Sequence, residues 1–277
     1  MEIYYKNSNN ETMVLTQYPV RLKQKTAGIY SYEWEVDATE LGTGSRVNAF
    51  EKKAKEYEMT VDFSGTRGSR AELLQEFYEL VDYDVIHKSP GRLYVGEQYV
   101  EGYVIASESQ NYEDRYRTVG KICTFYVPYP FWMEEKTYSF PIQDKETESD
   151  FLDFPYDFPY DFTIQGTGMV LQNEHYIESG FRMIIYGPCV NPYVTIGGHL
   201  YRVNTTVDSR EYLVIETKNN LVYRVKNTGE KVNEFNNREK SESVFEKIPP
   251  GQQTVSWPGT FGWDITLYNE RSEPKWS

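Results

Sequence analysis

The sequence has few of the residues from which metal and redox sites are built. Among its 277 residues are two cysteines and three histidines. Cys123 and Cys189 lie far apart, and neither belongs to a CxxC motif or to zinc-finger spacing. The histidines, His87, His175 and His199, stand alone without an HExxH motif. We therefore expect buried free thiols, consistent with synthesis in a reducing cytosol, and neither a metal nor another cofactor.

Long apolar runs and an excess of basic residues are also missing. No run reaches the ~18 apolar residues that a membrane span requires, and the first residues show no basic region followed by an apolar stretch. The 42 acidic residues outnumber the 29 basic ones, which gives a net charge of -13. Nucleic acids and anionic membranes attract Lys and Arg, so the sequence predicts a soluble protein with neither partner.

The motifs of common catalytic sites are absent as well. No serine lies in a Gly-x-Ser-x-Gly elbow, and the Gly-Thr-Gly stretch at 42–44 is too short for a phosphate-binding loop. A glycosidase needs only two carboxylates about 5 to 10 Å apart, but an abundance of acids does not place such a pair. Asp153, Asp157 and Asp161 lack the alternating ligands, turn glycine and closing glutamate of a calcium loop. The sequence therefore predicts a protein that is not an enzyme.

Aromatic residues, mostly tyrosine, are what the chain has in quantity. It is 39% hydrophobic and 16% aromatic, with 25 Tyr, a residue suited to strands and to wet interfaces. Residues 30–36 alternate between aromatic or apolar and polar side chains, which predicts a half-buried strand, and a polar loop follows at 42–45. Residues 57–63 alternate more cleanly and predict a strand with one apolar face. That face comprises Tyr57, Met59, Val61 and Phe63.

A single strong helix is expected over residues 69–87. Ser69 is a good N-cap, and Glu72 stands three residues later, as in a capping box. Apolar residues then recur at helical spacing, and Ser-Pro-Gly at 89–91 ends the pattern. The expected apolar face consists of Leu74, Phe77, Tyr78, Val81 and Val85.

A hairpin follows the expected helix. Residues 92–95 and 98–105 flank Gly96-Glu97, a two-residue turn with glycine first, which indicates a type II′ hairpin. A polar loop is expected at 107–115, and the next strand at 121–127. The N-terminal unit, residues 1–143, is thus expected to be a β-domain with one helix.

Residues 144–162 form an acidic connector between two units. It contains seven acidic residues and a single lysine, Lys145. Residues 153–162 repeat Phe-Pro-Tyr-Asp with a period of four. The prolines oppose a helix and exclude a central strand, while the rings are too apolar for a free linker. We interpret this stretch as an extended strap whose rings dock on a neighbouring surface. The strap residues are Phe154, Tyr156, Phe158, Tyr160 and Phe162.

The C-terminal unit, residues 163–277, is expected to be all β. Gly197-Gly198 and Lys218-Asn219-Asn220 each separate two short strand patterns, and the last strand is expected at 263–268. Short strands with regular turns and no helix favour a β-sandwich or a jelly roll. Trp257 and Trp263 lie within strand patterns, so we expect them in its core.

The order of several short motifs along nearly the whole chain is similar to that of a known protein family. A capped helix precedes Gly-Arg-Leu-Tyr-Val at 91–95, and Val-Pro-Tyr-Pro-Phe-Trp follows at 127–132. The aromatic-proline junction, Pro250-Gly251 with Val255, and Trp-Asp-Ile-Thr-Leu-Tyr at 263–268 complete the order. The sequence resembles the distal tail protein family of phages and phage-tail-like particles of Gram-positive bacteria.

The resemblance implies a mainly β protein in two parts. Its N-terminal belt domain has one helix and an extended hairpin and assembles into a hexameric ring, and a galectin-like β-sandwich lies outside the ring. Such a ring joins the tail tube to the tip or baseplate hub and to receptor-binding proteins. The protein would be made in the host cytoplasm and reside in the virion tail, and the family supplies no catalytic residues.

Within such a ring, edge strands of the first unit would be shared between copies. We expect the hairpin at 92–105 and the strand at 121–127 to form the ring interface. The candidate residues are Leu93, Tyr94, Val95, Tyr99, Tyr103, Ile122 and Phe125.

The alternative function is a carbohydrate-binding module that acts at the host cell wall through residues 163–277. Trp257, Trp263 and Trp276 could stack on sugar faces in a galectin-like sandwich. A shared fold alone does not establish a sugar site. Trp276 stands close to the C-terminus and is expected to be mobile.

Overall fold

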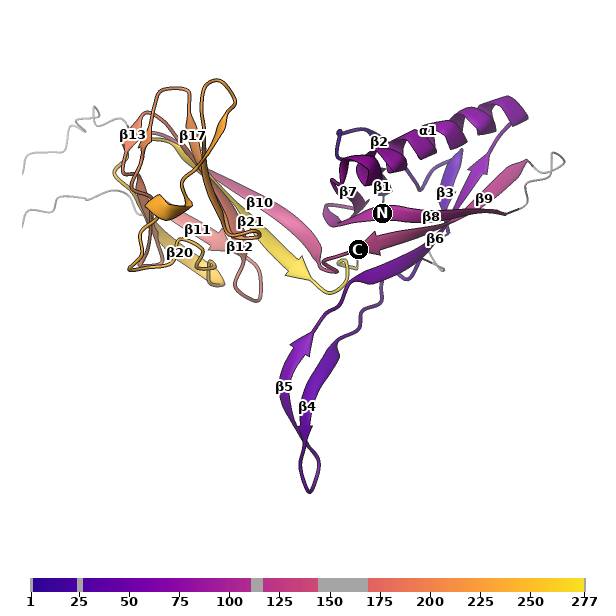
Figure 1. Cartoon of the computed structure of the whole chain (residues 1–277), viewed down its shortest axis with the longest axis horizontal. Helices are drawn as coiled ribbons and strands as arrows, with labels where there is room; N and C mark the ends of the chain where they lie inside the picture. Colours follow the sequence, from indigo (N-terminus) through magenta and orange to yellow (C-terminus); the bar gives the residue numbers. More distant parts are fainter. Residues whose placement is uncertain (1, 24–26, 111–116, 144–168, 277) are drawn as a thin grey trace, which may run out of the picture. The chain divides into compact units, whose positions relative to one another are not determined.

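The computed structural model describes residues 2–23, 27–110, 117–143 and 169–276. Its contacts divide the chain into two compact units, residues 1–134 with 270–277 and residues 135–269 (Figure 1). The boundary therefore differs from the expected one after residue 143. Both divisions fall inside strands, where the sequence pattern gives no sign of a break. The connector 144–162 and its strap residues lie outside the described residues.

The first unit is an antiparallel β-structure with one helix. Its main strands are β1 (Ile3–Lys6), β2 (Thr12–Val14), β3 (Val20–Leu22), β6 (Lys55–Ser64), β7 (Gly91–Val95), β8 (Gln98–Gln110), β9 (Thr118–Val127) and the start of β10 (Trp132–Phe140). Pairing runs in the order β2–β1–β7–β8–β9–β6–β3. The mainly β class with one helix is confirmed.

The helix α1 (Arg67–His87) begins two residues earlier than expected. Thr66, not Ser69, is the N-cap, and the Ser69 N–H donates to Thr66 Oγ1 at 3.4 Å. Lys88 ends the helix in a left-handed conformation, with its N–H directed to the carbonyls of Asp84 and Val85. Of the expected apolar face, Phe77 and Val81 are buried. The buried residues of α1 are Arg70, Phe77, Leu80, Val81 and Asp84.

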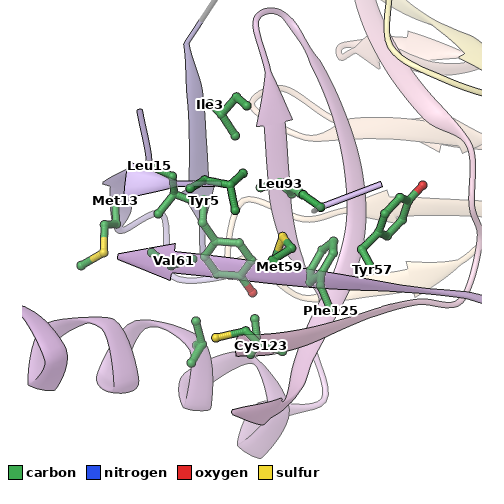
Figure 2. Close-up of a cluster of buried hydrophobic side chains, with 14 of the residues drawn as sticks. Ile3, Tyr5, Met13, Leu15, Tyr57, Met59, Val61, Leu93, Cys123 and Phe125 are labelled. Carbon is green, nitrogen blue, oxygen red and sulfur yellow. The ribbon is translucent and has the colours of Figure 1, made fainter. Parts of the chain in front are cut away.

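The core of the first unit lies between the helix and the strands (Figure 2). Tyr57, Met59, Val61 and Phe63 are all buried, which confirms the face that the alternation of β6 predicts. Cys123 also lies in this core as a free thiol. Cys189, in the second unit, is half-buried and free. The prediction of free thiols is thus confirmed, although only Cys123 is fully buried.

The predicted hairpin after the helix is present and longer than expected. Val95 pairs with Gln98 across the turn, and Gly96 has a φ of 62°, which a glycine adopts without strain. The strand β8 continues to Gln110 rather than ending near 105. Residues 107–110 are therefore strand, not loop, because they pair with β9 as far as Gly120.

A second hairpin replaces the half-buried strand expected at 30–36. Residues 28–34 do not form a strand, and β4 (Glu35–Glu40) pairs with β5 (Ser45–Glu51) around the glycine-bearing turn. Every residue of both strands is exposed. Figure 1 shows this ribbon extending beyond the other strands of the first unit.

The second unit is a β-sandwich, as expected. One sheet has the order β19–β18–β17–β12–β21 and the other β11–β20–β14–β15. Its elements are β11 (Met169–Asn173), β12 (Gly180–Tyr186), β13 (Cys189–Val190), β14 (Tyr193–Ile196), β15 (His199–Arg202), β16 (Thr206–Val207), β17 (Tyr212–Glu216), β18 (Leu221–Val225), β19 (Lys231–Asn233), the short helix η1 (Phe235–Asn237), β20 (Gly251–Ser256) and β21 (Trp263–Arg271). Side chains from both sheets share one buried cluster, which includes Trp257 and Trp263.

Candidate assembly surface of the first unit

The residues expected at a ring interface separate into two groups. Leu93, Val95 and Phe125 belong to the buried core of the unit. Because one chain already covers these side chains, they are not available to a neighbouring chain. The expectation is corrected for these residues, since alternate positions of a strand point to opposite faces.

Tyrosines of β1, β7 and β8 occupy the opposite face of the strands. Tyr4 pairs with Tyr94, and Tyr94 pairs with Tyr99 on the next strand. The Tyr4 and Tyr94 rings stack with centroids 4.4 Å apart, and the Arg92 guanidinium lies 4.2 Å from the Tyr99 ring centroid. These neighbours cover Tyr99, which is buried, whereas Tyr94 is half-buried.

The outward face continues over β8 and β9. Tyr103 pairs with Tyr126, and Ile122 lies four residues before Tyr126, so these side chains share one face. All three are half-buried. Burial raises the pKa of the Tyr103 phenol, so at neutral pH it is an uncharged O–H donor. We call Tyr94, Tyr103, Ile122 and Tyr126 the outward patch.

The hairpin β4–β5 carries an apolar face that nothing covers in the described part of the chain. Val36 pairs with Phe50, and Ala38 pairs with Val47, so these four side chains point the same way. Val36, Val47 and Phe50 are 54%, 46% and 61% exposed. We call Val36, Ala38, Val47 and Phe50 the hairpin stripe.

A bulge explains why sequence patterning misses the hairpin stripe. The pairing shifts between Asp37 and Ala38, which leaves Asn48 as the extra residue of β5. Val47 and Phe50 therefore face the same side although they are three residues apart. Asn48 donates from Nδ2 to Thr39 Oγ1 at 2.9 Å and fixes the irregularity. A two-residue period cannot detect such a face.

Aromatic rings hold a lysine at the base of this hairpin. Lys52 Nζ lies 5.6, 5.0 and 4.4 Å from the ring centroids of Tyr32, Trp34 and Phe131. It also donates to the Pro130 carbonyl at 3.2 Å. Tyr32 and Trp34, expected on a half-buried strand, thus serve as walls around a cation. Residues 32 and 131 are too distant in sequence for local patterns to predict this contact.

Within the described ranges, no group of three or more His, Cys, Asp and Glu side chains is arranged to hold a metal ion. No helix in those ranges combines the length and the apolar character needed to cross a membrane.

Two of the three tryptophans considered for sugar stacking are buried in the core of the second unit. Trp263 is fully buried, and Trp257 is buried with its indole N–H donating to the Phe261 carbonyl at 3.0 Å. Trp276 is exposed and stacks on Tyr30 of the first unit, with centroids 4.1 Å apart. The first two are core residues, as expected from the sequence.

Comparison with known proteins gives matches among solved structures alone. No protein-family model and no curated protein matches this chain. It resembles SPP1 Dit (gp 19.1), described as a paradigm of hub adsorption apparatus in phages infecting Gram-positive bacteria. The identity is 10% and the TM-score 0.57, over 97% of this chain and 99% of that one.

Two structures of the phage P2 baseplate in its activated conformation also match. The chain from the structure with Ca is 11% identical, with a TM-score of 0.62 over 99% of this chain and 100% of that one. The chain from the structure with Sr is 12% identical, with a TM-score of 0.61 over 99% of each. At these identities the similarity concerns the fold, which is shared over nearly the full length.

Proposed function

We propose that this protein is a structural hub of a phage or phage-tail-like tail tip. Identical copies form a ring, hexameric as in the family that the sequence resembles, and the ring joins the tail tube to tip or baseplate proteins. The fold shared with SPP1 Dit and with the P2 baseplate chains supports the proposal. The single observation that carries it is the exposed hairpin stripe.

The hairpin stripe needs a partner for physical reasons. A two-stranded ribbon that buries none of its side chains is marginally stable in water, and its free edges invite pairing with other chains. Packing the stripe against a neighbouring copy would remove Val36, Val47 and Phe50 from water, with a gain of about 25 cal/mol per Å² of apolar area. We therefore infer that the hairpin stripe is the surface through which copies of this protein associate.

The geometry of the contact favours a ring over a dimer. The hairpin stripe and the outward patch are different surfaces, so a contact between them is head-to-tail and can close only by rotation. We propose that the stripe of one copy packs on the outward patch of the next. Closure then leaves no hairpin uncovered, which suppresses uncontrolled association.

The remaining roles follow from this assignment. The protein is a non-enzymatic part of the virion tail, made in the host cytoplasm, with the tail tube, the tip hub and receptor-binding proteins as partners. The strap residues in 144–162 stay a prediction about the link between the two units. Binding of cell-wall sugar has no comparable support, because Trp257 and Trp263 are core residues.

The proposal is tested with the purified full chain and with isolated tail particles. Light scattering over a range of concentrations should give the mass of a closed ring, and electron microscopy should show rings of uniform size. If tail proteins are needed to nucleate the ring, it should appear in particles instead. A monomer at every concentration, together with particles that lack the protein, would overturn the proposal.

A further inference from the structure

The first unit contains a cavity of about 450 Å³ at the base of the hairpin β4–β5. Its walls come from residues 31–33 and Glu35, from the Lys-Lys-Ala-Lys segment at 52–55, from Tyr57 near the beginning of β6, and from Pro130 and Ser272. Neither the assembly surface nor the core explains this cavity.

The cavity has a positive charge in an acidic protein. Its charged lining residues are three lysines and two glutamates, so one positive charge is in excess. Glu35 is already paired with Lys53, with Nζ and Oε2 2.5 Å apart. The chain as a whole carries a net charge of -13. A single negative charge would neutralise the lining.

Two of the lysines lack a carboxylate partner in a salt bridge among the described residues. Lys52 Nζ donates to the Pro130 carbonyl at 3.2 Å, and Lys55 Nζ donates to the carbonyl and hydroxyl oxygens of Ser31 at 2.5 and 2.9 Å. Burial, with Lys55 adding repulsion, lowers the pKa of Lys52 to about 8, and burial also lowers that of Lys55 although Glu33 opposes it. Both shifts come mainly from burial, which disfavours the charged ammonium form.

The Tyr57 hydroxyl is the second independent observation. Tyr57 is 2% exposed and lines the cavity, yet its oxygen has no hydrogen-bond partner of acceptable geometry in the described chain. Figure 2 shows its hydroxyl directed away from the other labelled core side chains. Burial raises its pKa, although the nearby Trp132 indole opposes the shift, so the phenol keeps its proton and is a donor. A buried donor without an acceptor is costly and rare.

We propose that this cavity binds a carboxylate, held by the ammonium groups of Lys52 and Lys55 and by the Tyr57 hydroxyl. A carboxylate has two oxygens that accept charge-assisted hydrogen bonds, and its one negative charge matches the excess in the lining. A phosphate dianion would leave a negative charge uncompensated. The carboxylate belongs either to a small free molecule or to an acidic side chain of a neighbouring copy. The second source rests on the proposed ring.

The experiment follows acetate binding to the full chain by NMR, with the indole N–H signal of Trp132 as the reporter and sodium chloride at equal ionic strength as the control. Three variants are compared with wild type: Tyr57→Phe, Lys55→Gln and, as a distant exposed control, Lys240→Gln. Loss of one charge-assisted hydrogen bond should weaken acetate binding about tenfold or more in the first two, and leave the control unchanged.

Tyr57→Phe separates binding from folding. It removes a hydroxyl that has no partner, so the unfolding temperature should stay the same or rise, while acetate binding falls. The proposal is overturned if acetate acts no differently from chloride, or if Tyr57→Phe binds acetate as wild type does.

Ring formation by the Lys55→Gln variant distinguishes the two possible sources of the carboxylate. If Lys55→Gln loses both acetate binding and ring formation, the carboxylate is a neighbour's side chain. If it loses acetate binding and still assembles, the ligand is a free small molecule. Failure of the wild type to form rings would count against the proposed function but not against an acetate site, so the two failures are distinguishable.

Discussion

Val36 and Phe50 face each other across the hairpin β4–β5, and more than half of each side chain is exposed to solvent. Directly paired residues in an antiparallel ribbon point to the same side, so the two form a contiguous apolar surface. Together with Ala38 and Val47 they form the hairpin stripe, on which we propose that a neighbouring copy packs. The proposals on assembly depend on this relationship.

Phe50→Ser should separate assembly from folding. Because Phe50 makes no core contact, the free energy of unfolding should change by less than about 0.5 kcal/mol. Association should weaken by about tenfold or more, as expected for an aromatic anchor of an interface. Light scattering and denaturant unfolding of the same preparation measure both effects. Asp37→Asn, on the polar face of the ribbon, is the matched control and should assemble normally.

Tyr5→Phe should destabilise the first unit without changing its fold. Asp84 is fully buried and accepts hydrogen bonds from the Tyr5 hydroxyl at 2.6 Å and from the Ser8 N–H and hydroxyl at 2.7 Å. Losing the Tyr5 donor leaves part of the carboxyl unsatisfied, which costs about 1 to 3 kcal/mol. Denaturant unfolding followed by circular dichroism checks the prediction. An unchanged midpoint would show that Asp84 does not tie the helix to β1.

Lys52→Met should alter how stability depends on pH. The pKa of Lys52 is lowered from 10.5 to about 8 in the folded chain, mainly by burial. Between pH 8 and 10.5 the unfolded chain then binds more protons than the folded chain at this site, so this contribution to stability rises with pH. Relative to Lys52→Met, the wild type should gain stability from pH 8 to 10.5.

The groups that face Lys52 define the control for this measurement. Lys55 repels it, Lys53, Glu33 and Glu35 line the same cavity, and Tyr32 lies against it. These groups are common to both proteins, so the difference between the two pH profiles isolates Lys52. A difference that stays constant across the window, or that moves in the opposite direction, would contradict the shift.

Trp263→Ala should destabilise the second unit selectively. Trp263 is fully buried and stacks on Phe140, with centroids 4.2 Å apart and planes 8° from parallel. Removing a buried tryptophan costs about 3 to 5 kcal/mol. Calorimetry should show the transition of the second unit at a lower temperature while that of the first is retained. If Trp263 were an exposed platform for sugar binding, its replacement by alanine would leave the unfolding temperature of the second unit almost unchanged.

The sequence predicts elements whose evidence is local. The alternation of β6, the glycine-first turn at Gly96 and the burial of Trp263 are each confirmed. The interface prediction is wrong for Leu93 and Val95 because it did not apply the alternation of side chains along a strand. Leu93 and Tyr94 are consecutive and therefore point to opposite faces. A two-residue period applied to 93–95 would have excluded Leu93 and Val95.

The features that the sequence does not predict depend on distant or irregular contacts. The hairpin stripe is hidden by the bulge at Asn48, and the cage around Lys52 joins residues 32, 34 and 131. The N-cap is Thr66 rather than Ser69, because both residues are good caps and only the backbone geometry distinguishes them. The bulge, the cage around Lys52 and the position of the N-cap all depend on tertiary structure, which local sequence patterns do not encode.

The most direct test of the account places a photo-crosslinking amino acid at position 50 of the full chain. Illumination of assembled protein or tail particles should link one copy to another, and mass spectrometry should map the adducts to the outward patch, around Tyr103, Ile122 and Tyr126. The same probe at Asp37, on the polar face, should give far fewer links. Links confined to a single chain, in particles that contain the protein, would contradict the claim that the hairpin stripe joins neighbouring copies.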